Sequence, residues 1–288
     1  MTVPAFGLGT FRLKDQTVID SVRNALAVGY RAIDTAQIYG NEAEVGQAIA
    51  DSGVPRDDIY LTTKVWITAF KRDALLASLR TSLEKLRTEY VDLALIHWPS
   101  PNDKVDVPME EYLAALAEAK AQGLTREIGI SNFTIAQTRK AIGILGAGAI
   151  ATNQIEIHPF LPNDELVDYC FKNDIMPAAY SPLGSQNQVP TTGERVGENK
   201  TLNEIAAKGG NTLAQVLIAW GLRRGYVVLP KSGNPARMES NFKSIELSDA
   251  DFQAVNDVAK GRHFRFVNMK DTFGYDVWPE ETAKNLSA

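Results

Sequence analysis

The sequence predicts an α/β protein folded as a (β/α)8 barrel of the TIM type, and three observations support this prediction. Short apolar runs rich in β-branched residues recur along the chain, and a segment with helical periodicity follows each of them. These runs number eight, as one such barrel requires. The chain of 288 residues also has a suitable length for this architecture. The predicted strands are residues 5–9, 31–34, 59–64, 91–97, 127–131, 151–155, 176–180 and 226–230.

The segments between these strands carry start and stop signals for helices. Asp15 is expected to cap a helix that continues to Val28 and ends at Gly29. Asn41 is expected to cap a second helix that ends before Gly53. The predicted elements are therefore short and well separated.

Two segments do not fit the repeating strand and helix pattern. Residues 184–199 are rich in Gly, Asn and Thr, which predicts a long loop after the seventh strand that could act as a partial lid. Residues 262–279 carry several aromatic side chains without a clear period. We expect this C-terminal tail, residues 262–288, to pack over the barrel mouth, and we predict a single domain over residues 1–288.

Composition and charge argue against several classes of protein. Apolar residues make up 44% of the chain and charged residues 23%, which is typical of a globular protein with a large core. The net charge of -5 comes without a basic stripe, so no nucleic-acid partner is expected. No signal peptide or membrane-spanning run is visible, which predicts a cytoplasmic protein without a membrane partner.

Cysteine and histidine usage predicts no disulfide and no metal. Cys170 is the single cysteine, so an internal disulfide is impossible, and we expect it to be half-buried in a helix. No spacing of His, Cys, Asp and Glu resembles a metal site. His158 and His263 are interpreted as structural, because neither has a titratable partner at a strand end nearby in the sequence.

Titratable side chains follow three consecutive predicted strands. Asp34 ends the second strand with Tyr39 shortly after it, Lys64 ends the third, and His97 ends the fourth. Barrels of this architecture build their active sites at the carboxyl ends of the strands. The four side chains are therefore expected to converge in one mouth as an acid–base site.

The motifs that contain these residues resemble the aldo-keto reductase family. The matching segments occur in the family's order and read GLGT at 7–10, GYRAIDTA at 29–36, YGNE at 39–42, IHWP at 96–99, GISNF at 129–133, NQIE at 153–156, YSPL at 180–183 and PKS at 230–232. Up to about Gln154 the chain most resembles the bacterial 2,5-diketo-D-gluconate reductase B group, whose members also reduce small dicarbonyls such as methylglyoxal. The resemblance implies reduction of an aldehyde or ketone to an alcohol.

In this interpretation Tyr39 is the general acid that protonates the carbonyl oxygen. The ordinary pKa of a tyrosine is about 10, and the ammonium of Lys64 is expected to lower it by favouring the phenolate. Asp34 would pair with Lys64 and keep it charged. His97 would bind the carbonyl oxygen by a hydrogen bond and orient it.

The implied cofactor is NADP(H) rather than NAD(H), bound without a Rossmann turn. Gly7-Leu8-Gly9 is not followed by the third glycine of a dinucleotide-binding loop. The resemblance implies an extended dinucleotide across the barrel mouth, its carboxamide held by Ser131, Asn132 and Gln154 and its ring stacked on Tyr180. The full predicted cofactor set is Thr10, Ser131, Asn132, Gln154, Tyr180, Ser181, Leu183, Lys231, Ser232, Asn234, Arg237 and Asn241.

The preference for NADPH rests on residues 231–241. Lys231, Ser232 and Arg237 lie near the predicted start of a helix, a combination that suits a phosphate monoester. Ser240 stands where many family members carry a Glu that contacts the adenine. That contact is therefore not expected here.

Apolar walls are expected on the substrate side of the mouth. Phe11, Trp66 and Trp98 would surround the polar groups, with His97 also facing the substrate, a small-molecule carbonyl compound. Phe11 stands where many relatives carry Trp, which could widen the pocket.

Two other functions remain open on the sequence. Lys64 could form a Schiff base in a barrel lyase or isomerase, since strand-end lysines also serve that chemistry. Alternatively, the chain could be a non-catalytic subunit that senses a nucleotide. The resemblance also implies a monomer, because most relatives of this size act alone.

Overall fold

The computed structural model describes residues 3–99, 107–184 and 194–279. Eight strands in this part of the chain form one parallel sheet in sequence order. The strands are β1 Leu8–Gly9, β2 Ala32–Asp34, β3 Tyr60–Val65, β4 Val91–Ile96, β5 Thr125–Ser131, β6 Thr152–Glu156, β7 Met176–Tyr180 and β8 Val227–Leu229. Each overlaps one of the predicted runs.

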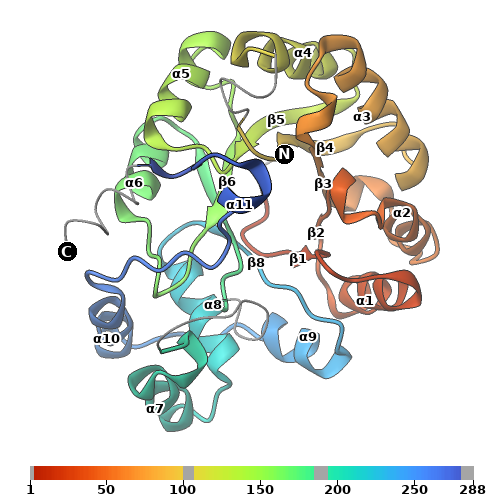
Figure 1. The fold of residues 1–288 in the computed structure, drawn as a ribbon. Helices are drawn as coiled ribbons and strands as arrows, with labels where there is room; N and C mark the ends of the chain where they lie inside the picture. The colour runs from red at the N-terminus through yellow and green to blue at the C-terminus, as the bar shows by residue number, and fades with distance from the viewer. Residues whose placement is uncertain (1–2, 100–106, 185–193, 280–288) are drawn as a thin grey trace.

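The first and last strands meet and close the sheet into a barrel. The backbone N–H of Gly7 donates to the carbonyl of Val228 at 3.1 Å, and that of Gly9 donates to Pro230 at 3.0 Å. A Cβ atom added at Gly7 would lie 2.8 Å from the Cβ of Ala32, so this seam has no room for a side chain. The predicted (β/α)8 barrel is confirmed (Figure 1).

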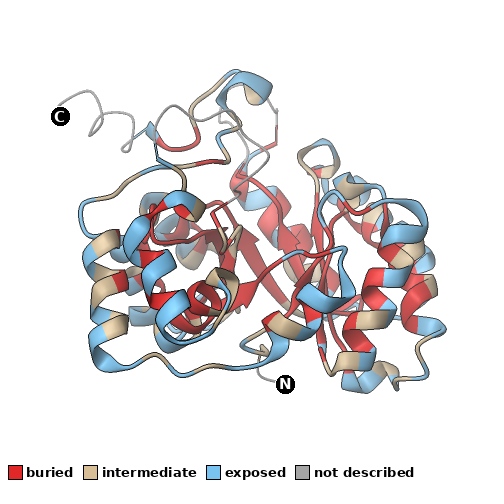
Figure 2. Ribbon diagram, turned by 90° about the horizontal axis from the view of Figure 1, so that it is seen from below, coloured by how far each residue is buried: buried red, intermediate tan, exposed pale blue. Residues whose placement is uncertain are grey.

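The helices surround the barrel and turn their apolar faces inward. In the described residues they are α1 Asp15–Val28, α2 Glu42–Ala50, α3 Arg72–Leu86, α4 Met109–Ala121, α5 Ile135–Leu145, α6 Asp164–Lys172, α7 Lys200–Lys208, α8 Leu213–Arg223, α9 Pro235–Phe242, α10 Asp249–Ala259 and α11 Lys270–Phe273. Four short 3₁₀ turns accompany them: η1 Gln37–Tyr39, η2 Arg56–Asp58, η3 Ile67–Ala69 and η4 Val196–Glu198. Buried residues occupy the strands and the helix faces turned toward them (Figure 2).

Both predicted helices exist, but the predicted cap at Asp15 is wrong and the one at Asn41 is right in position only. Asp15 is the first residue of α1 and has a left-handed φ of 49°, so the N-cap position falls to Lys14, which makes no side-chain cap bond. Asn41 does occupy the N-cap position of α2, but its side chain does not cap the helix. The side chain binds the loop after β1 instead, because its amide donates to the carbonyls of Thr10 and Leu13 at 3.0 Å each.

The C-terminal tail packs over the barrel mouth, as predicted. The ring of Phe273 in α11 lies 5.9 Å from Trp66 and 5.6 Å from Trp98, measured between centroids. The hydroxyl of Tyr275 donates to the carbonyl of Pro99 at 2.9 Å. Within the predicted loop 184–199, residues 185–193 lie outside the described residues, as do residues 280–288 of the tail.

A cluster of charges lies at the opposite, amino end of the strands. The buried carboxylate of Asp92 accepts from Arg56 at 2.8 Å, from Arg126 at 3.3 Å and from the backbone N–H of Leu61 at 2.9 Å. The ring of Tyr90 lies beside both guanidinium groups, at 4.3 Å from Arg56 and 3.9 Å from Arg126. This cluster is far from the mouth and ties β3, β4 and β5 together at the base.

Candidate active site

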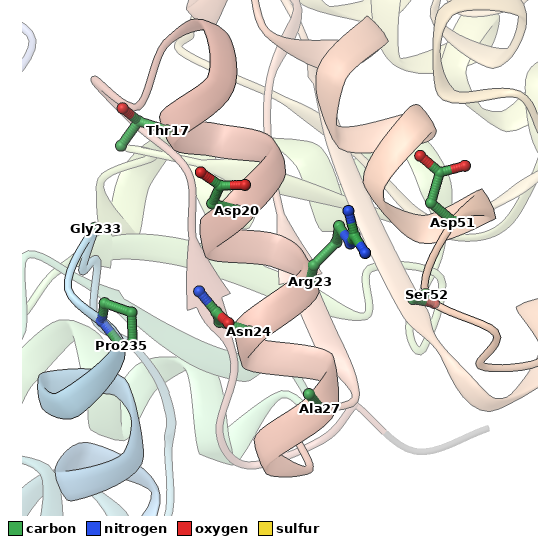
Figure 3. A pocket seen from close by; sticks show the side chains of 9 residues that line it. All are labelled: Thr17, Asp20, Arg23, Asn24, Ala27, Asp51, Ser52, Gly233 and Pro235. Atoms are coloured by element: carbon green, nitrogen blue, oxygen red, sulfur yellow. The ribbon is translucent and has the colours of Figure 1, made fainter.

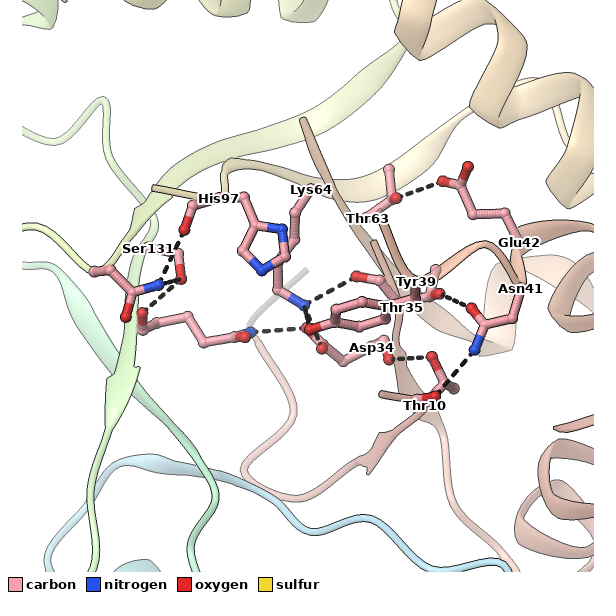
Figure 4. Close-up of polar contacts among 12 residues, drawn as sticks. Thr10, Asp34, Thr35, Tyr39, Asn41, Glu42, Thr63, Lys64, His97 and Ser131 are labelled. Atoms are coloured by element: carbon pink, nitrogen blue, oxygen red, sulfur yellow. Dashed lines mark hydrogen bonds and ion pairs between the residues drawn. The ribbon is translucent and has the colours of Figure 1, made fainter. Parts of the chain in front are cut away.

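Asp34, Tyr39 and Lys64 meet at the carboxyl ends of β2 and β3 (Figure 4). The Nζ atom of Lys64 lies 2.5 Å from Oδ1 of Asp34, 2.9 Å from the carbonyl of Thr35 and 3.3 Å from the hydroxyl of Tyr39. All three donors of the ammonium are therefore engaged. Lys64 is fully buried, and Asp34 is 5% exposed.

The fold explains why these side chains converge. β2 ends at Asp34, and η1 follows it closely enough to turn Tyr39 back over the barrel mouth. Lys64 lies one residue before the end of β3, and His97 follows β4, with its backbone N–H bound to the carbonyl of Val65 at 3.1 Å. Parallel neighbouring strands end at one rim, which brings the four residues together.

The pKa shifts at this rim agree with the expectation for Lys64 and differ from it for Tyr39. Burial lowers the pKa of Lys64, but Asp34 and Tyr39 raise it more, so the net pKa is raised and the side chain stays an ammonium. Burial raises the pKa of Tyr39, and Lys64 lowers it by a smaller amount. The expectation that Lys64 brings this pKa below its ordinary value is therefore wrong, because burial of the phenol outweighs the charge.

The imidazole of His97 is neutral at physiological pH. Burial and the nearby charge of Lys64 hold its pKa well below the usual range. Its ring centroid lies 5.6 Å from that of Tyr39 and 5.2 Å from that of Trp66. Its Nδ1 atom is buried without a hydrogen-bond partner among the described residues.

A polar cluster borders these residues on the side of β5, β6 and β7. The amide of Asn132 donates to the carbonyl of His97 at 3.0 Å, and its oxygen accepts from the hydroxyl of Tyr180 at 2.8 Å. The hydroxyl of Ser131 donates to the backbone carbonyl of Gln154 at 2.8 Å. The residues predicted to hold the nicotinamide, through its carboxamide and its ring, therefore lie beside one another in space.

Residues 231–241 form the turn before α9 and the helix itself. Asn234 caps α9 by accepting from the backbone N–H of Arg237 at 2.9 Å, as the predicted helix start requires. Partial burial lowers the pKa of Lys231, and the charges of Arg237 and Arg12 lower it further. Arg237 and Arg12 therefore both lie within electrostatic range of Lys231.

Arg12 is absent from the predicted site. It follows Phe11 in the loop after β1, with a left-handed φ of 63°. The signal that could have found it is its position in the loop that leaves the first strand end, on the same rim as the other predicted residues.

Among the remaining predicted cofactor residues, Thr10, Ser181, Leu183 and Ser232 follow strand ends at this rim, and Asn241 lies further along α9. The hydroxyl of Thr10 donates to the backbone carbonyl of Asp34 at 3.0 Å. Ser181 follows β7 in a left-handed conformation, with φ 49°, and Leu183 packs against the core. Ser232 and Asn241 are buried, at 6% and 7% exposure.

Aromatic side chains line the open side of the mouth. The ring of Phe11 lies 5.0 Å from that of Tyr39 and is half exposed. Trp66 and Trp98 approach from the loops after β3 and β4, and Phe273 from the tail covers both. The sequence pointed to the aromatic tail without singling out Phe273.

A second hollow is lined in part by Gly233 and Pro235, which belong to segment 231–241. It encloses about 640 Å³ between α1, the end of α2 and the start of α9. The side chains of Asp20, Arg23 and Asn24 project toward it from α1, with Asp51 on the other side (Figure 3). Two carboxylates against one guanidinium make it a poor site for a phosphate.

Metal-binding clusters and membrane-spanning helices are both absent from the described residues. No group of three or more His, Cys, Asp or Glu side chains is placed there to hold a metal ion. None of the helices in the described ranges has the length and apolar character needed to cross a membrane. Cys170 is fully buried in α6 rather than half-buried.

The interpretation of His158 needs a correction. Its Nε2 atom lies 2.9 Å from Oε1 of Glu156, the last residue of β6, so it does have a titratable partner at a strand end. Both side chains are fully buried.

A cluster of acid–base groups at the carboxyl ends of barrel strands is the arrangement found in barrel enzymes, which carry out their chemistry at that end. A sequence model of the aldo/keto reductase family matches residues 5–260, and the chain belongs to this family. It is therefore an oxidoreductase by family, as predicted.

Individual relatives support membership of this family. A glycerol 2-dehydrogenase (NADP(+)) of Hypocrea jecorina is 50% identical over 97% of this chain and 96% of its own. The methylglyoxal reductase DkgB of Escherichia coli O157:H7 is 52% identical over 88% of this chain and 92% of its own, which confirms the closer resemblance. The structure of an aldose reductase from Giardia lamblia matches with a TM-score of 0.87 and 32% identity, over 96% of this chain and 99% of its own.

Proposed function

We propose that this protein reduces aldehyde or ketone carbonyls with NADPH and that Tyr39 is the general acid. The observation that carries the proposal is the contact of 3.3 Å between the Tyr39 hydroxyl and the Lys64 ammonium. The hydroxyl accepts a hydrogen bond from Lys64, so its own proton is available to the substrate oxygen. The names of the glycerol 2-dehydrogenase (NADP(+)) and of the methylglyoxal reductase support the same reaction class and cofactor.

The direction of the pKa shifts is compatible with proton donation. A tyrosine with a raised pKa is fully protonated at neutral pH, which a general acid must be. The phenolate left after the transfer would lie beside an ammonium that Asp34 holds in its charged form. Lys64 therefore favours the product of the proton transfer.

His97 would orient the substrate. Its neutral imidazole can present an N–H to the carbonyl oxygen without adding a second proton source. The walls formed by Phe11, Trp66 and Trp98 would surround the rest of the molecule. We propose a small dicarbonyl such as methylglyoxal, or a keto sugar acid such as 2,5-diketo-D-gluconate, as the substrate.

The residues at the rim fit a bound NADP(H), which supplies the hydride. The charges of Arg237 and Arg12 both oppose that of Lys231, and an anion such as the 2′-phosphate would relieve this repulsion. Asn132 and Gln154 offer amide donors and acceptors to the carboxamide, and Tyr180 offers a ring for stacking. These features favour NADPH over NADH.

The Schiff-base alternative is disfavoured by the state of Lys64. An amine nucleophile must lose its proton and reach the substrate, but this side chain is fully buried and its pKa is raised. Treatment with borohydride and a carbonyl compound would trap such an adduct. We expect no trapped adduct at Lys64.

We test the proposal with the Tyr39→Phe variant and methylglyoxal. NADPH oxidation should be steady in the wild type and fall by roughly 100- to 10,000-fold in the variant, the usual contribution of a general acid. The dissociation constant of NADPH should stay the same, because only a hydroxyl is removed. A wild type that binds NADPH without oxidising it with any carbonyl compound would favour the nucleotide-sensing alternative.

We also propose that the chain is a single domain that acts as a monomer in the cytoplasm. The tail covers the mouth of its own barrel, so the site needs no second chain to complete its aromatic wall. Sedimentation equilibrium at micromolar concentration should give a mass near 31.6 kDa.

A further inference from the structure

Glu156 lies at the end of β6 and has no part in the proposed proton transfer. Its carboxylate is fully buried, which is costly unless hydrogen bonds compensate for the lost water. The backbone N–H of Phe266 donates to Oε1 at 2.8 Å, and that of Val267 donates to Oε2 at 2.9 Å. A buried carboxylate from the barrel therefore binds two consecutive N–H groups of the C-terminal tail.

His158 completes this contact. Its Nδ1 atom accepts from the backbone N–H of Phe160 at 3.2 Å, so the ring proton lies on Nε2, which donates to Glu156 at 2.9 Å. Its ring centroid is 4.9 Å from that of Phe266. The N–H of Phe264 also donates to the carbonyl of Phe160 at 2.7 Å.

The tail also supplies a charge that faces the carboxylate. Nη1 of Arg265 lies 4.0 Å from Oε2 of Glu156, and this guanidinium side chain is 5% exposed. The same guanidinium lies over the ring of Trp278, at 3.8 Å from its centroid. Residues 264–267 are thus held to the end of β6 by backbone bonds, a ring contact and opposite charges.

From this point the tail crosses the mouth to the far side of the site. α11 lies over the middle of the barrel in Figure 1, between β6 and the loops after β3 and β4. There Phe273 contacts Trp66 and Trp98, and Tyr275 binds the carbonyl of Pro99. The aromatic wall of the site therefore includes a segment anchored at Glu156.

We propose that Glu156, held in place by His158, is the positioning residue for this wall. It sets the affinity for the carbonyl substrate through the tail, without touching substrate or cofactor. The inference rests on the proposed function for its kinetic consequences only. Releasing residues 264–267 would withdraw Phe273 from Trp66 and Trp98 and leave the substrate less enclosed, while the contacts among Asp34, Lys64 and Tyr39 remain.

The kinetic experiment compares Glu156→Gln, Phe273→Ala and the double variant. A Gln side chain cannot accept both tail N–H groups at its two terminal atoms, because one of these atoms is itself a donor. We expect each single change to raise KM for methylglyoxal about tenfold. We expect the dissociation constant of NADPH to change less than about twofold. The double variant should match the larger single effect, because both changes disable the same wall.

Two further variants supply an independent test of the tail contact and a control. Val267→Pro removes one tail N–H without changing the barrel, so it should reproduce the rise in KM even if Glu156→Gln folds poorly. Glu204→Gln is the matched control, because it removes a carboxylate from an exposed ion pair on α7. Its KM should equal that of the wild type. Additive effects of Glu156→Gln and Phe273→Ala, or weaker NADPH binding in Glu156→Gln, would overturn the proposal.

Hydrogen exchange separates this inference from the proposed function. Amides of residues 264–278 should exchange faster in Glu156→Gln than in the wild type, while those of β2 and β3 keep their protection. This readout does not depend on activity. Unchanged exchange in the tail would refute the anchor even in an active enzyme, and faster exchange would support it even if no carbonyl compound were reduced.

Discussion

The side-chain amide of Gln154 donates a hydrogen bond of 2.7 Å to Oδ2 of Asp34, across the barrel from β6 to β2. The other oxygen of the same carboxylate binds Lys64. One carboxylate thus joins the predicted carboxamide-binding residue, Gln154, to the ammonium of Lys64 beside the predicted proton donor, Tyr39. The prediction from sequence gave Gln154 a role in binding the nicotinamide alone. The structure adds a contact with the acid–base cluster.

Replacing Gln154 by Leu should affect both cofactor binding and catalysis. The change keeps the size of the side chain but removes its amide, so the dissociation constant of NADPH should rise about tenfold, the effect of one or two neutral hydrogen bonds. kcat should also fall, because Asp34 loses one of its partners. Fluorescence titration and single-turnover kinetics measure the two effects. Gln122→Leu on the outer surface is the control, and an unchanged NADPH affinity in Gln154→Leu would contradict the cofactor role.

The pH profile of carbonyl reduction should be level through the neutral range. Tyr39 acts as an acid only below its pKa, and burial raises that pKa above the ordinary value of about 10. kcat/KM should therefore decline only as the pH rises through this raised pKa. His97 should give no inflection near pH 6.5, because its pKa is held well below that value.

This profile can be measured from pH 6 to pH 10 at constant ionic strength. In Lys64→Met the plateau should fall and should still be level up to pH 10, because the charge that lowers the pKa of Tyr39 is gone. A decline between pH 7 and pH 8 in the wild type would mean that burial does not dominate the pKa of Tyr39.

The barrel and its strand ends could be predicted because both follow from local patterns. β-branched runs fix where the strands lie, and parallel order brings their carboxyl ends to one rim. Asp34, Lys64 and His97 could therefore be expected at one mouth before any coordinates were known. The sign of the shift at Tyr39 could not be predicted, because a sequence reveals a neighbouring charge but not the degree of burial.

The wrong interpretations of individual residues have specific physical causes. Asn41 has the side chain favoured at a helix start, yet neighbours from the β1 loop bind it more completely than the helix does. Glu156 is the last residue of β6 and His158 follows it by two positions, and residues i and i+2 of an extended chain point to the same side. That spacing was the available signal for their contact. Arg12 was missed although it follows the predicted residue Phe11 in the loop that leaves the first strand end.

Replacing Arg237 by Ala should weaken NADPH binding selectively. A charge-assisted hydrogen bond contributes about 1.5–3 kcal/mol, so KM for NADPH should rise roughly 10- to 100-fold. KM for NADH should change little, because NADH lacks the 2′-phosphate. Steady-state kinetics with each cofactor measure the ratio. Arg139→Ala on α5 is the control for loss of a surface guanidinium, and a parallel rise for both cofactors would place the phosphate elsewhere.

Asp92 at the base of the barrel should matter for stability and not for catalysis. Its buried carboxylate binds Arg56 and the N–H of Leu61, so Asp92→Asn leaves a guanidinium without its counter-charge. The free energy of unfolding should fall by about 3 kcal/mol, as for other partly buried pairs that lose one member. Urea unfolding followed by circular dichroism measures this, and kcat/KM should stay within about twofold of the wild type, because catalytic groups in these barrels lie at the opposite end. Asp57→Asn, which alters an exposed partner of Arg126, should change stability little. A large loss of activity in Asp92→Asn with normal stability would show that the base of the barrel is coupled to the mouth.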